Sequence, residues 1–300
     1  MVRPRRSVTV CFHGANLSVT VTKKAVEVDE WINNTIRNHC HHLRDLIVGL
    51  DIEWHPNTSG DFKPPAPAAT LQLCVGRRCL IFQLLHRDFI PDSLLNFLAY
   101  PFFTFVGVGV QDDAEKLFRD HGLIVRKVVD LRHLGAWVYD SKEFSRMGLK
   151  RIALEVLGQL MEKPLEVTLS DWDAKDLTFR QIEYGSIDAF ASFQIGFNLF
   201  TMAAYKLRLL ITSVCCLGGP IMLKMESMFT MFGKKQNRPP LKRHQDQKAS
   251  LEEIQPVARN SGLRSLNNAT RIGNLKISIS NAHLNILLQS MLMLRLYSKY

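Results

Sequence analysis

Four acidic residues and one tyrosine stand in three short segments of the chain, at spacings that suit catalysis with metal ions. Asp51 and Glu53 lie in LIVGLDIEW, Asp113 lies in VGVGVQDDAEKL, and Tyr184 and Asp188 lie in EYGSIDAF. Carboxylate oxygens are the hard ligands that Mg²⁺ and Mn²⁺ prefer in proteins. A fold that gathers these side chains could hold two such ions.

The first pair lies in an apolar segment that the sequence predicts to be a central β-strand. Between Ile47 and Trp54 only Asp51 and Glu53 are charged, and the two-residue period of a strand places both on one face. Two like charges in a buried strand repel each other and are costly to desolvate, and bound cations would relieve both costs. The alternative is a strand end that reaches water with two solvated acids.

The third segment predicts a long helix. Residues 178–200 contain no proline, and Thr178 with Gln181 forms a T-x-x-Q capping box at their start. Tyr184 and Asp188 are four residues apart and therefore share one face of this helix. A phenol at that place could orient a water molecule held by a metal ion on the carboxylate. The alternative is a partly buried tyrosine beside a surface aspartate.

The middle segment predicts a buried strand over residues 103–110, followed by an amphipathic helix that Asp113 opens. The two glycines of Gly107-Val108-Gly109 permit close backbone approach, but the segment lacks the third glycine of a dinucleotide site and the lysine of a P-loop. Acidic residues in the first turn of a helix also interact favourably with its dipole, so Asp113 has a purely structural interpretation as well.

Further elements must position these segments. We expect a β-hairpin over residues 8–22 around a Gly-Ala-Asn turn, a helix over 28–39, strands over 69–76, 78–85 and 124–132, and a helix over 91–100 that starts at a proline. Three early strands followed by alternating helices and strands predict an α/β protein with a mixed central sheet and helices on both sides.

In their order along the chain, DIEW, VGVGVQDDAEKLFRDHGL and LTFRQIEYGSIDAF resemble the three motifs of the DEDDy group of 3′-5′ exonucleases. Within that group the chain is most similar to the Werner-syndrome-protein exonuclease domain and its stand-alone plant relatives, and more distantly similar to RNase D. The resemblance covers about residues 8–205, including GLKRIALEVLG at 148–158 and SDWD at 170–173. It implies an RNase H-like exonuclease fold.

The resemblance also implies a role for each residue. Asp51 would bridge two metal ions, Glu53 and Asp188 would bind the ion that activates a water molecule, and Asp113 would help hold the second ion through water. Tyr184, which stands where related groups have histidine, would orient the attacking water. The implied reaction is metal-dependent removal of nucleoside monophosphates from the 3′ end of DNA, or of RNA.

A second class of function is a catalytically silent nucleic-acid-binding or scaffold protein of the same fold. The complete set of five residues argues against it. Clustered acids without ions cost stability, so an inactive relative would be expected to have lost at least one of them. Trp54 and Trp172 are candidate substrate contacts, since an aromatic face stacks on any base, and their alternative is a place in the core. The six cysteines form no CxxC pair and are expected to be reduced thiols.

Charge divides the chain into a neutral body and a basic extension. We assign residues 1–27 to an N-terminal hairpin of the exonuclease domain, 28–206 to its catalytic part, and 207–300 to a basic, largely disordered or atypical extension. Residues 1–206 hold 24 basic and 24 acidic residues, whereas residues 207–300 hold 14 and 4 and carry the whole net charge of +10. A basic pI therefore does not by itself mark the catalytic body as a nucleic-acid-binding surface.

The extension contains three distinct stretches. Residues 207–223 are too short for a membrane helix and are expected to extend the last helix. Residues 234–248 are predicted to be a polar linker, with a nuclear-localisation signal or a nucleic-acid contact as the alternative. Residues 281–297 could form a short apolar helix for self-association. The first ten residues lack the apolar core of a signal peptide. We expect a protein of the nucleus or cytoplasm with no membrane partner, which relies on a helicase or repair partner for unwinding because it has no helicase motif.

Overall fold

The structure is a computed structural model that describes residues 7–40, 43, 46–56, 66–216, 271–272 and 275–276. Two compact units are distinguished along the chain: the described residues of the first end at Leu207, and the second begins at Arg208. In the second unit, strands β8 (Arg271–Ile272) and β9 (Leu275–Lys276) form a short antiparallel pair. The predicted linker at 234–248 and the apolar helix at 281–297 lie outside the described residues.

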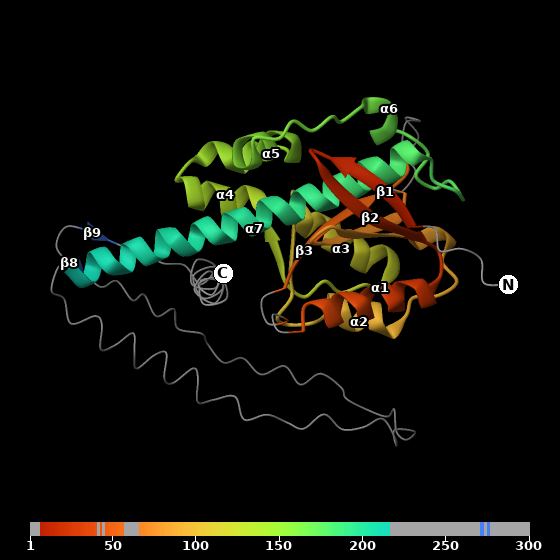
Figure 1. The fold of residues 1–300 in the computed structure, drawn as a ribbon, viewed down its shortest axis with the longest axis horizontal. Helices are drawn as coiled ribbons and strands as arrows, with labels where there is room; N and C mark the ends of the chain where they lie inside the picture. The colour runs from red at the N-terminus through yellow and green to blue at the C-terminus, as the bar shows by residue number, and fades with distance from the viewer. Residues whose placement is uncertain are drawn as a thin grey trace, which may run out of the picture. The chain divides into compact units, whose positions relative to one another are not determined.

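A seven-stranded mixed sheet forms the centre of the first unit (Figure 1). Its strands follow the spatial order β1-β2-β5-β4-β3-β6-β7, in which β2 with β5, β3 with β6, and β6 with β7 are parallel and the other neighbours antiparallel. The strands are β1 (Ser7–Phe12), β2 (Ala15–Thr22), β3 (Ile47–Glu53), β4 (Thr70–Val75), β5 (Arg78–Gln83), β6 (Thr104–Gly107) and β7 (Val128–Asp130). The predicted mixed sheet is confirmed.

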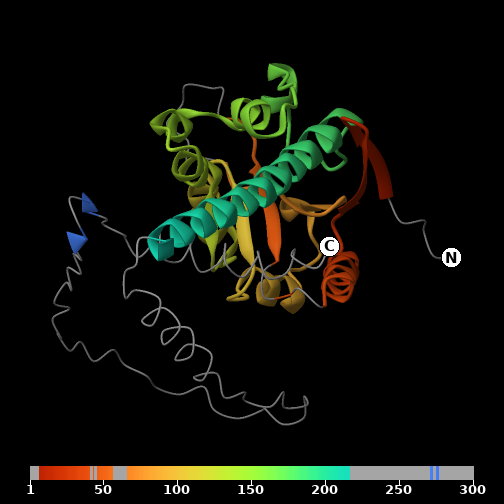
Figure 2. The same cartoon turned by 60° about the vertical axis from the view of Figure 1, so that its left-hand side comes forward.

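Helices cover both faces of this sheet, as the sequence predicts. They are α1 (Ala25–Asn38), α2 (Asp92–Leu98), α3 (Val110–His121), α4 (Leu131–Tyr139), α5 (Leu149–Leu157), α6 (Leu165–Thr168) and α7 (Phe179–Cys216), with 3₁₀ turns at Leu84–His86 and Lys142–Arg146. Helix α7 runs across one face, and α1 and α2 lie against the other (Figures 1 and 2). No helix in the described part of the chain combines the length and the apolar character that a membrane crossing needs.

Strand β3 shows why the two acids of DIEW face helix α7. Val48, Leu50 and Ile52 are buried in the cluster that also holds the apolar side chains of α1 and α2. Ile47 points to the opposite face and packs in the cluster that holds the buried side chains of α7. Because side chains alternate along a strand, residues 49, 51 and 53 share the face of Ile47, so both carboxylates are presented to α7.

Glycine residues let α7 lie close to the sheet. A Cβ atom on Gly49 of β3 would fall 2.0 Å from the carbonyl oxygen of Ala189, so no larger residue fits there without moving the helix. Two glycines of α7 make further close approaches, Gly185 to Gln72 of β4 and Gly196 to Val106 of β6. The helix therefore crosses β4, β3 and β6 in turn, which brings its residue 188 beside β3.

The structure corrects several details of the predicted elements. The strand predicted over 103–110 ends at Gly107, and the helix after it begins at Val110, three residues before Asp113. The first hairpin turns at His13 and Gly14, with φ of +44° and +78°, and not at Gly-Ala-Asn; a two-residue turn with both φ positive matches the twist of its strands. Helix α2 begins at Asp92, so Pro91 is its N-cap residue and not its first helical residue. The strand predicted over 124–132 shortens to β7, because the Asp130 carboxylate accepts a hydrogen bond from the Arg132 amide and starts helix α4 there.

The predicted capping box at the start of α7 is confirmed. The Thr178 amide donates to Gln181 Oε1 at 2.9 Å, and the Gln181 amide donates to Thr178 Oγ1 at 3.3 Å. These bonds fix the first turn of the helix that carries Tyr184 and Asp188. The thiols of Cys11, Cys40, Cys74 and Cys79 are free, as predicted.

Candidate metal centre

Three carboxylates from two elements meet between the sheet and α7. Asp51 and Glu53 of β3 and Asp188 of α7 each offer one oxygen, and the three oxygens lie within 4.8 Å of one another. The strand supplies two of them because of its two-residue period, and the glycine contacts of α7 deliver the third. Their separation is small enough for one cation to draw all three together.

Burial and mutual repulsion oppose ionisation of this cluster. Burial raises the pKa of Asp51 well above its ordinary value, and the charges of Glu53, Asp188 and Asp113 raise it further. The pKa of Glu53 rises to about 8, again through burial first and then through the charge of Asp188. These carboxyl groups hold protons at a pH where solvated carboxylates have lost them, unless cations neutralise the site.

Asp113 lies near this trio but is not one of its three members. It stands in the first turn of α3, and its charge raises the pKa of both Asp51 and Glu53. Its own pKa rises to about 7, through burial and then through the charges of Asp112 and Asp130. The structure thus places the predicted second-motif acid at the margin of the cluster.

The turn before α3 explains this placement. Gly109 has a φ of +77°, a left-handed conformation that favours glycine, and its amide donates to the Asp130 carboxylate at 3.0 Å. The same carboxylate accepts hydrogen bonds from the Arg132 guanidinium. Asp130 therefore connects the start of α3 to the start of α4 and fixes the position of the first turn of α3, which carries Asp113.

Tyr184 and Asp188 lie on one face of α7, as their spacing predicts. The Tyr184 hydroxyl accepts a hydrogen bond from Thr168 Oγ1 at 3.2 Å, and its ring centroid lies 6.0 Å from that of Trp172. Burial and then the charge of Asp188 raise the pKa of the phenol, so it is protonated at neutral pH. In this state the hydroxyl can orient a water molecule but is a poor base.

Lys163 is part of the centre and was missed by sequence reasoning. Its Nζ contacts Asp188 Oδ2 at 2.5 Å and lies 5.2 Å from the centroid of the Tyr184 ring. The pKa of this ammonium is raised, because the charges of Asp188 and Asp51 outweigh burial, which alone would lower it. Lys163 lies between α5 and α6, where no periodic pattern marks it; its only signal was a charge just before Pro164.

The two candidate stacking residues fall in different environments. Trp172 is only 1% exposed and packs in the core, so it takes its alternative interpretation and offers no ring face to a base. Trp54 is 39% exposed, and Lys116 Nζ lies 5.1 Å from its ring centroid. Trp54 lines a cavity of about 310 Å³ together with Asp112, Asp113, Glu115, Lys116 and Arg119. Of the two, Trp54 alone remains a candidate substrate contact.

Comparison with known proteins matches the same region of the chain. The model of a 3′-5′ exonuclease family matches residues 21–202, which include every residue of the metal centre. Exonuclease 3′-5′ domain-containing protein 2 of Drosophila melanogaster is 34% identical over 161 residues, covering 53% of this chain and 26% of the fly protein. A 3′-5′ exonuclease of Arabidopsis thaliana is 31% identical over 182 residues, covering 59% of this chain and 62% of the plant protein.

A crystal structure of the EXD2 exonuclease domain soaked in Mn and dGMP is 30% identical, with a TM-score of 0.35, and the alignment covers 61% of this chain and 87% of that one. The chain spans about a quarter of the fly relative and less than two thirds of the plant relative. The family match covers more than half of the chain and agrees with the predicted RNase H-like fold. The chain therefore belongs to this family of 3′-5′ exonucleases.

Proposed function

We propose that this chain removes nucleoside monophosphates from the 3′ end of nucleic acid, with DNA as the preferred substrate. One observation carries the proposal: Asp51, Glu53 and Asp188 place three carboxylate oxygens within 4.8 Å of one another at a largely buried site. Such an arrangement is unfavourable by itself and becomes favourable when divalent cations bind.

The donor set fits Mg²⁺ or Mn²⁺, because it consists of carboxylate oxygens without nitrogen or sulfur ligands. Asp51, Glu53 and Asp188 would hold one ion, and Asp51 with Asp113 a second. Bound there, the ions would supply a more acidic water molecule and neutralise the charge that develops on the departing 3′ oxygen. The protein would hold the metal ions through these ligands and would place the water molecule in line with the bond that breaks at the terminal phosphate.

Tyr184 is the residue that we assign to the water molecule. Its hydroxyl lies 3.2 Å from Thr168 Oγ1, and its hydrogen bond with Asp188 directs the phenol toward the centre. A protonated phenol at this place positions the nucleophile, and its partial base character is small because its pKa is raised. This role makes the chain a member of the DEDDy subtype, in which tyrosine stands at this position.

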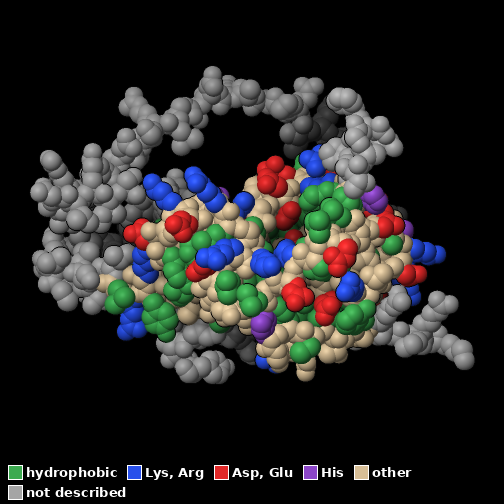
Figure 3. All heavy atoms as spheres, turned by 90° about the horizontal axis from the view of Figure 1, so that it is seen from above, with side chains coloured by type: hydrophobic (Ala, Val, Ile, Leu, Met, Phe, Trp, Pro, Cys, Tyr) green, Lys and Arg blue, Asp and Glu red, His purple; other side chains and the backbone are tan. Residues whose placement is uncertain are grey.

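Attraction of the substrate must be local. Residues 1–206 have no net formal charge, and on the face that Figure 3 shows, Lys and Arg side chains alternate with Asp and Glu. A broad positive surface would steer nucleic acid from a distance, and a mixed one does not. We therefore assign binding to the metal ions at the terminal phosphate and to Trp54, whose half-exposed indole can stack on the terminal base.

A digestion panel tests the proposal. The substrates are single-stranded DNA, 3′-recessed duplex DNA and RNA, each labelled at the 5′ end, and each is incubated with Mg²⁺, Mn²⁺ or EDTA. We expect ladders that shorten one nucleotide at a time from the 3′ end with either metal, and no products with EDTA. Binding of the same substrates without any product under either metal would support the silent nucleic-acid-binding alternative and refute the proposal.

A further inference from the structure

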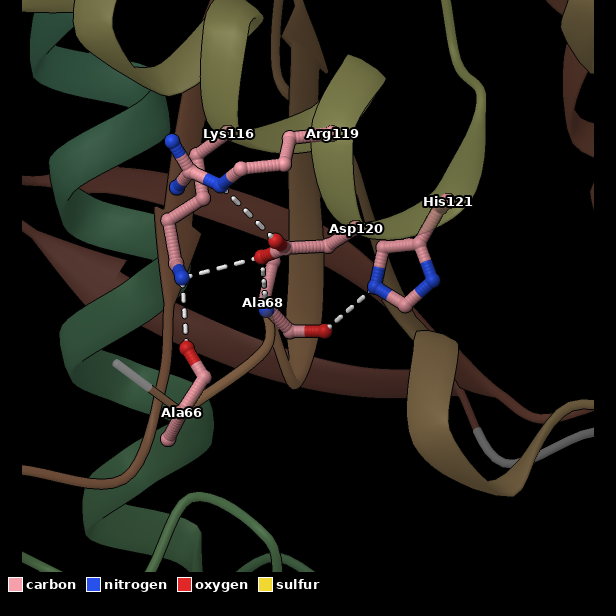
Figure 4. Close-up of polar contacts among 6 residues, drawn as sticks. All are labelled: Ala66, Ala68, Lys116, Arg119, Asp120 and His121. Carbon is pink, nitrogen blue, oxygen red and sulfur yellow. Dashed lines mark hydrogen bonds and ion pairs between the residues drawn. The ribbon is translucent and has the colours of Figure 1, made fainter. Parts of the chain in front are cut away.

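Lys116 is a buried lysine that the catalytic scheme does not use. It lies on α3, three residues after Asp113, and is 7% exposed. Its ammonium contacts Asp120 Oδ2 at 2.9 Å and donates to the Ala66 carbonyl at 2.5 Å (Figure 4). Its third neighbour is the indole of Trp54, 5.1 Å away at the ring centroid. Burial of a charge is costly unless it is paired, and all three neighbours interact favourably with an ammonium group.

The same helix fixes the chain on both sides of residues 57–65. Before them, Trp54 follows the metal ligand Glu53 and lies under the Lys116 ammonium. After them, the Ala68 amide donates to Asp120 Oδ2 at 2.9 Å, and the Ala68 carbonyl lies 2.7 Å from His121 Nε2 (Figure 4). The backbone at 66–68 is thus held by the side chains of Lys116, Asp120 and His121. The side chain of Trp54, in contrast, contacts Lys116.

The contact with Trp54 has a consequence for binding. An indole that is 39% exposed is free to change rotamer, and a cation over its face favours one orientation. Trp54 and Lys116 both line the cavity of about 310 Å³, which Asp113 also lines. A stacking surface held in place before the substrate arrives loses less conformational freedom on binding.

We propose that Lys116 is a positioning residue, which fixes the Trp54 indole at the rim of the metal centre and thereby sets affinity for the 3′-terminal nucleotide. This inference rests on the proposed function and adds a residue to it. The competing explanation is that Lys116 only anchors Ala66. The two explanations differ in whether the effect of Lys116 depends on Trp54.

A double-mutant cycle separates them. Lys116→Met, Trp54→Leu and the double variant are compared by kcat and KM on single-stranded DNA that ends in a normal or an abasic 3′ nucleotide. We expect Lys116→Met to raise KM by about threefold to tenfold with kcat changed by less than about twofold, and to add nothing in the Trp54→Leu background. On the abasic end, Lys116→Met should leave KM unchanged, since no base is present to stack. Lys150→Met, an exposed lysine on α5, is the charge control.

An equal rise in KM in both backgrounds, or on both 3′ ends, would overturn the inference. Quenching of tryptophan fluorescence by acrylamide gives a readout that needs no turnover: Lys116→Met should increase quenching when Trp54 is present and not in Trp54→Leu. Lys116→Arg keeps a cation over the ring and should show the KM and the quenching of the wild type. If Lys116→Met fails to fold, Lys116→Arg and Trp54→Leu are compared instead. A KM of Lys116→Arg as high as that of Trp54→Leu would then overturn the inference. Absence of product from every variant and from the wild type would refute the proposed function instead, while the quenching result would still decide the role of Lys116.

Discussion

Two lysine–carboxylate clusters of this protein look alike in their contacts and differ in their charge balance. Lys163 contacts Asp188 at 2.5 Å, and Lys116 contacts Asp120 at 2.9 Å. Around Lys163 the carboxylates outnumber the ammonium, and the pKa of Asp188 is raised by burial even though the lysine opposes the shift. Burial alone would also raise the pKa of Asp120, but the hydrogen bonds from Lys116 and the Ala68 amide bring it below its ordinary value.

The difference distinguishes a binding site from a structural contact. In the Lys116 cluster the Lys116 ammonium, the Arg119 guanidinium at 3.3 Å and the backbone amide of Ala68 all contact the one carboxylate of Asp120, so no further cation is needed. In the Lys163 cluster a single positive charge is shared among Asp51, Glu53 and Asp188, and the excess of negative charge can be neutralised only by added cations or by protons. Charge balance, and not the presence of an ion pair, identifies the candidate metal centre.

Loss of one candidate metal ligand should give the largest difference between the two clusters. Asp51→Asn should lower kcat on 3′-labelled DNA by at least about 1,000-fold, because the proposed ions would lose the ligand that we assign to both of them. The same substitution removes repulsion, so the metal-free variant should unfold at a higher temperature than the wild type. Glu155→Gln on α5, which only loses an ion pair with Arg151, is the control. A variant that keeps more than a tenth of wild-type activity would contradict the assignment of Asp51.

Tyr184 belongs to the cluster with excess negative charge, although it carries no charge itself. Tyr184→Phe should lower kcat by about 10- to 100-fold and leave KM nearly unchanged, since the hydroxyl acts on the nucleophile and not on the substrate. The ring still packs against Trp172, so the fold is preserved. Single-turnover kinetics at saturating metal measure the effect. A rise in KM without a fall in kcat would instead place Tyr184 in substrate binding.

The dependence of stability on pH should differ between metal-free and metal-bound protein. The unfolded chain releases the protons of Glu53 and Asp113 near their ordinary pKa values of 4.5 and 3.8, whereas the folded state holds them to about pH 8 and about pH 7. Across that window the folded state binds more protons, so the free energy of unfolding of the metal-free protein falls as pH rises and levels off above about pH 8.

Divalent cations compete with these protons, so Mg²⁺ should raise Tm more at about pH 8.5 than at about pH 5.5. Thermal unfolding with EDTA or with Mg²⁺ at the two pH values measures this difference. An equal rise in Tm at both values would mean that the carboxylates are already ionised and that the charge excess does not exist.

Local periodicity was enough to predict which faces carry the candidate metal ligands. Asp51 and Glu53 needed only the two-residue period of a strand, and Tyr184 and Asp188 only the turn of a helix, to be placed on the correct faces. The capping box of Thr178 and Gln181 was likewise a local signal, and its hydrogen bonds are present. The mixed sheet followed from the alternation of these elements along the chain.

Contacts between distant segments without a period could not be predicted. Lys163 reaches Asp188 from a non-helical link, and the Lys116 ammonium is held partly by the carbonyl of Ala66, a group that every residue has. Trp172 was a candidate stacking residue because an aromatic face stacks on any base, but packing against α7 buries it. Which aromatic residue faces solvent depends on the tertiary fold, which the spacing of motifs does not encode.

The smallest effects that we predict form a matched pair across the two clusters. Lys163→Met and Asp120→Asn each remove one partner of a lysine–carboxylate contact, and each should lower the free energy of unfolding of the metal-free protein by about 1–2 kcal/mol at neutral pH. Saturating Mg²⁺ should then return Lys163→Met to near the stability of the metal-bound wild type, because divalent charge replaces the lost ammonium. It should leave the deficit of Asp120→Asn unchanged, since that substitution leaves the Lys116 ammonium without its carboxylate and a divalent cation cannot neutralise a positive charge. Thermal or urea unfolding of both variants with EDTA and with Mg²⁺ measures the two deficits. Equal recovery of both variants would mean that Mg²⁺ stabilises the fold as a whole, and the distinction between a charge excess and a charge balance would then be wrong.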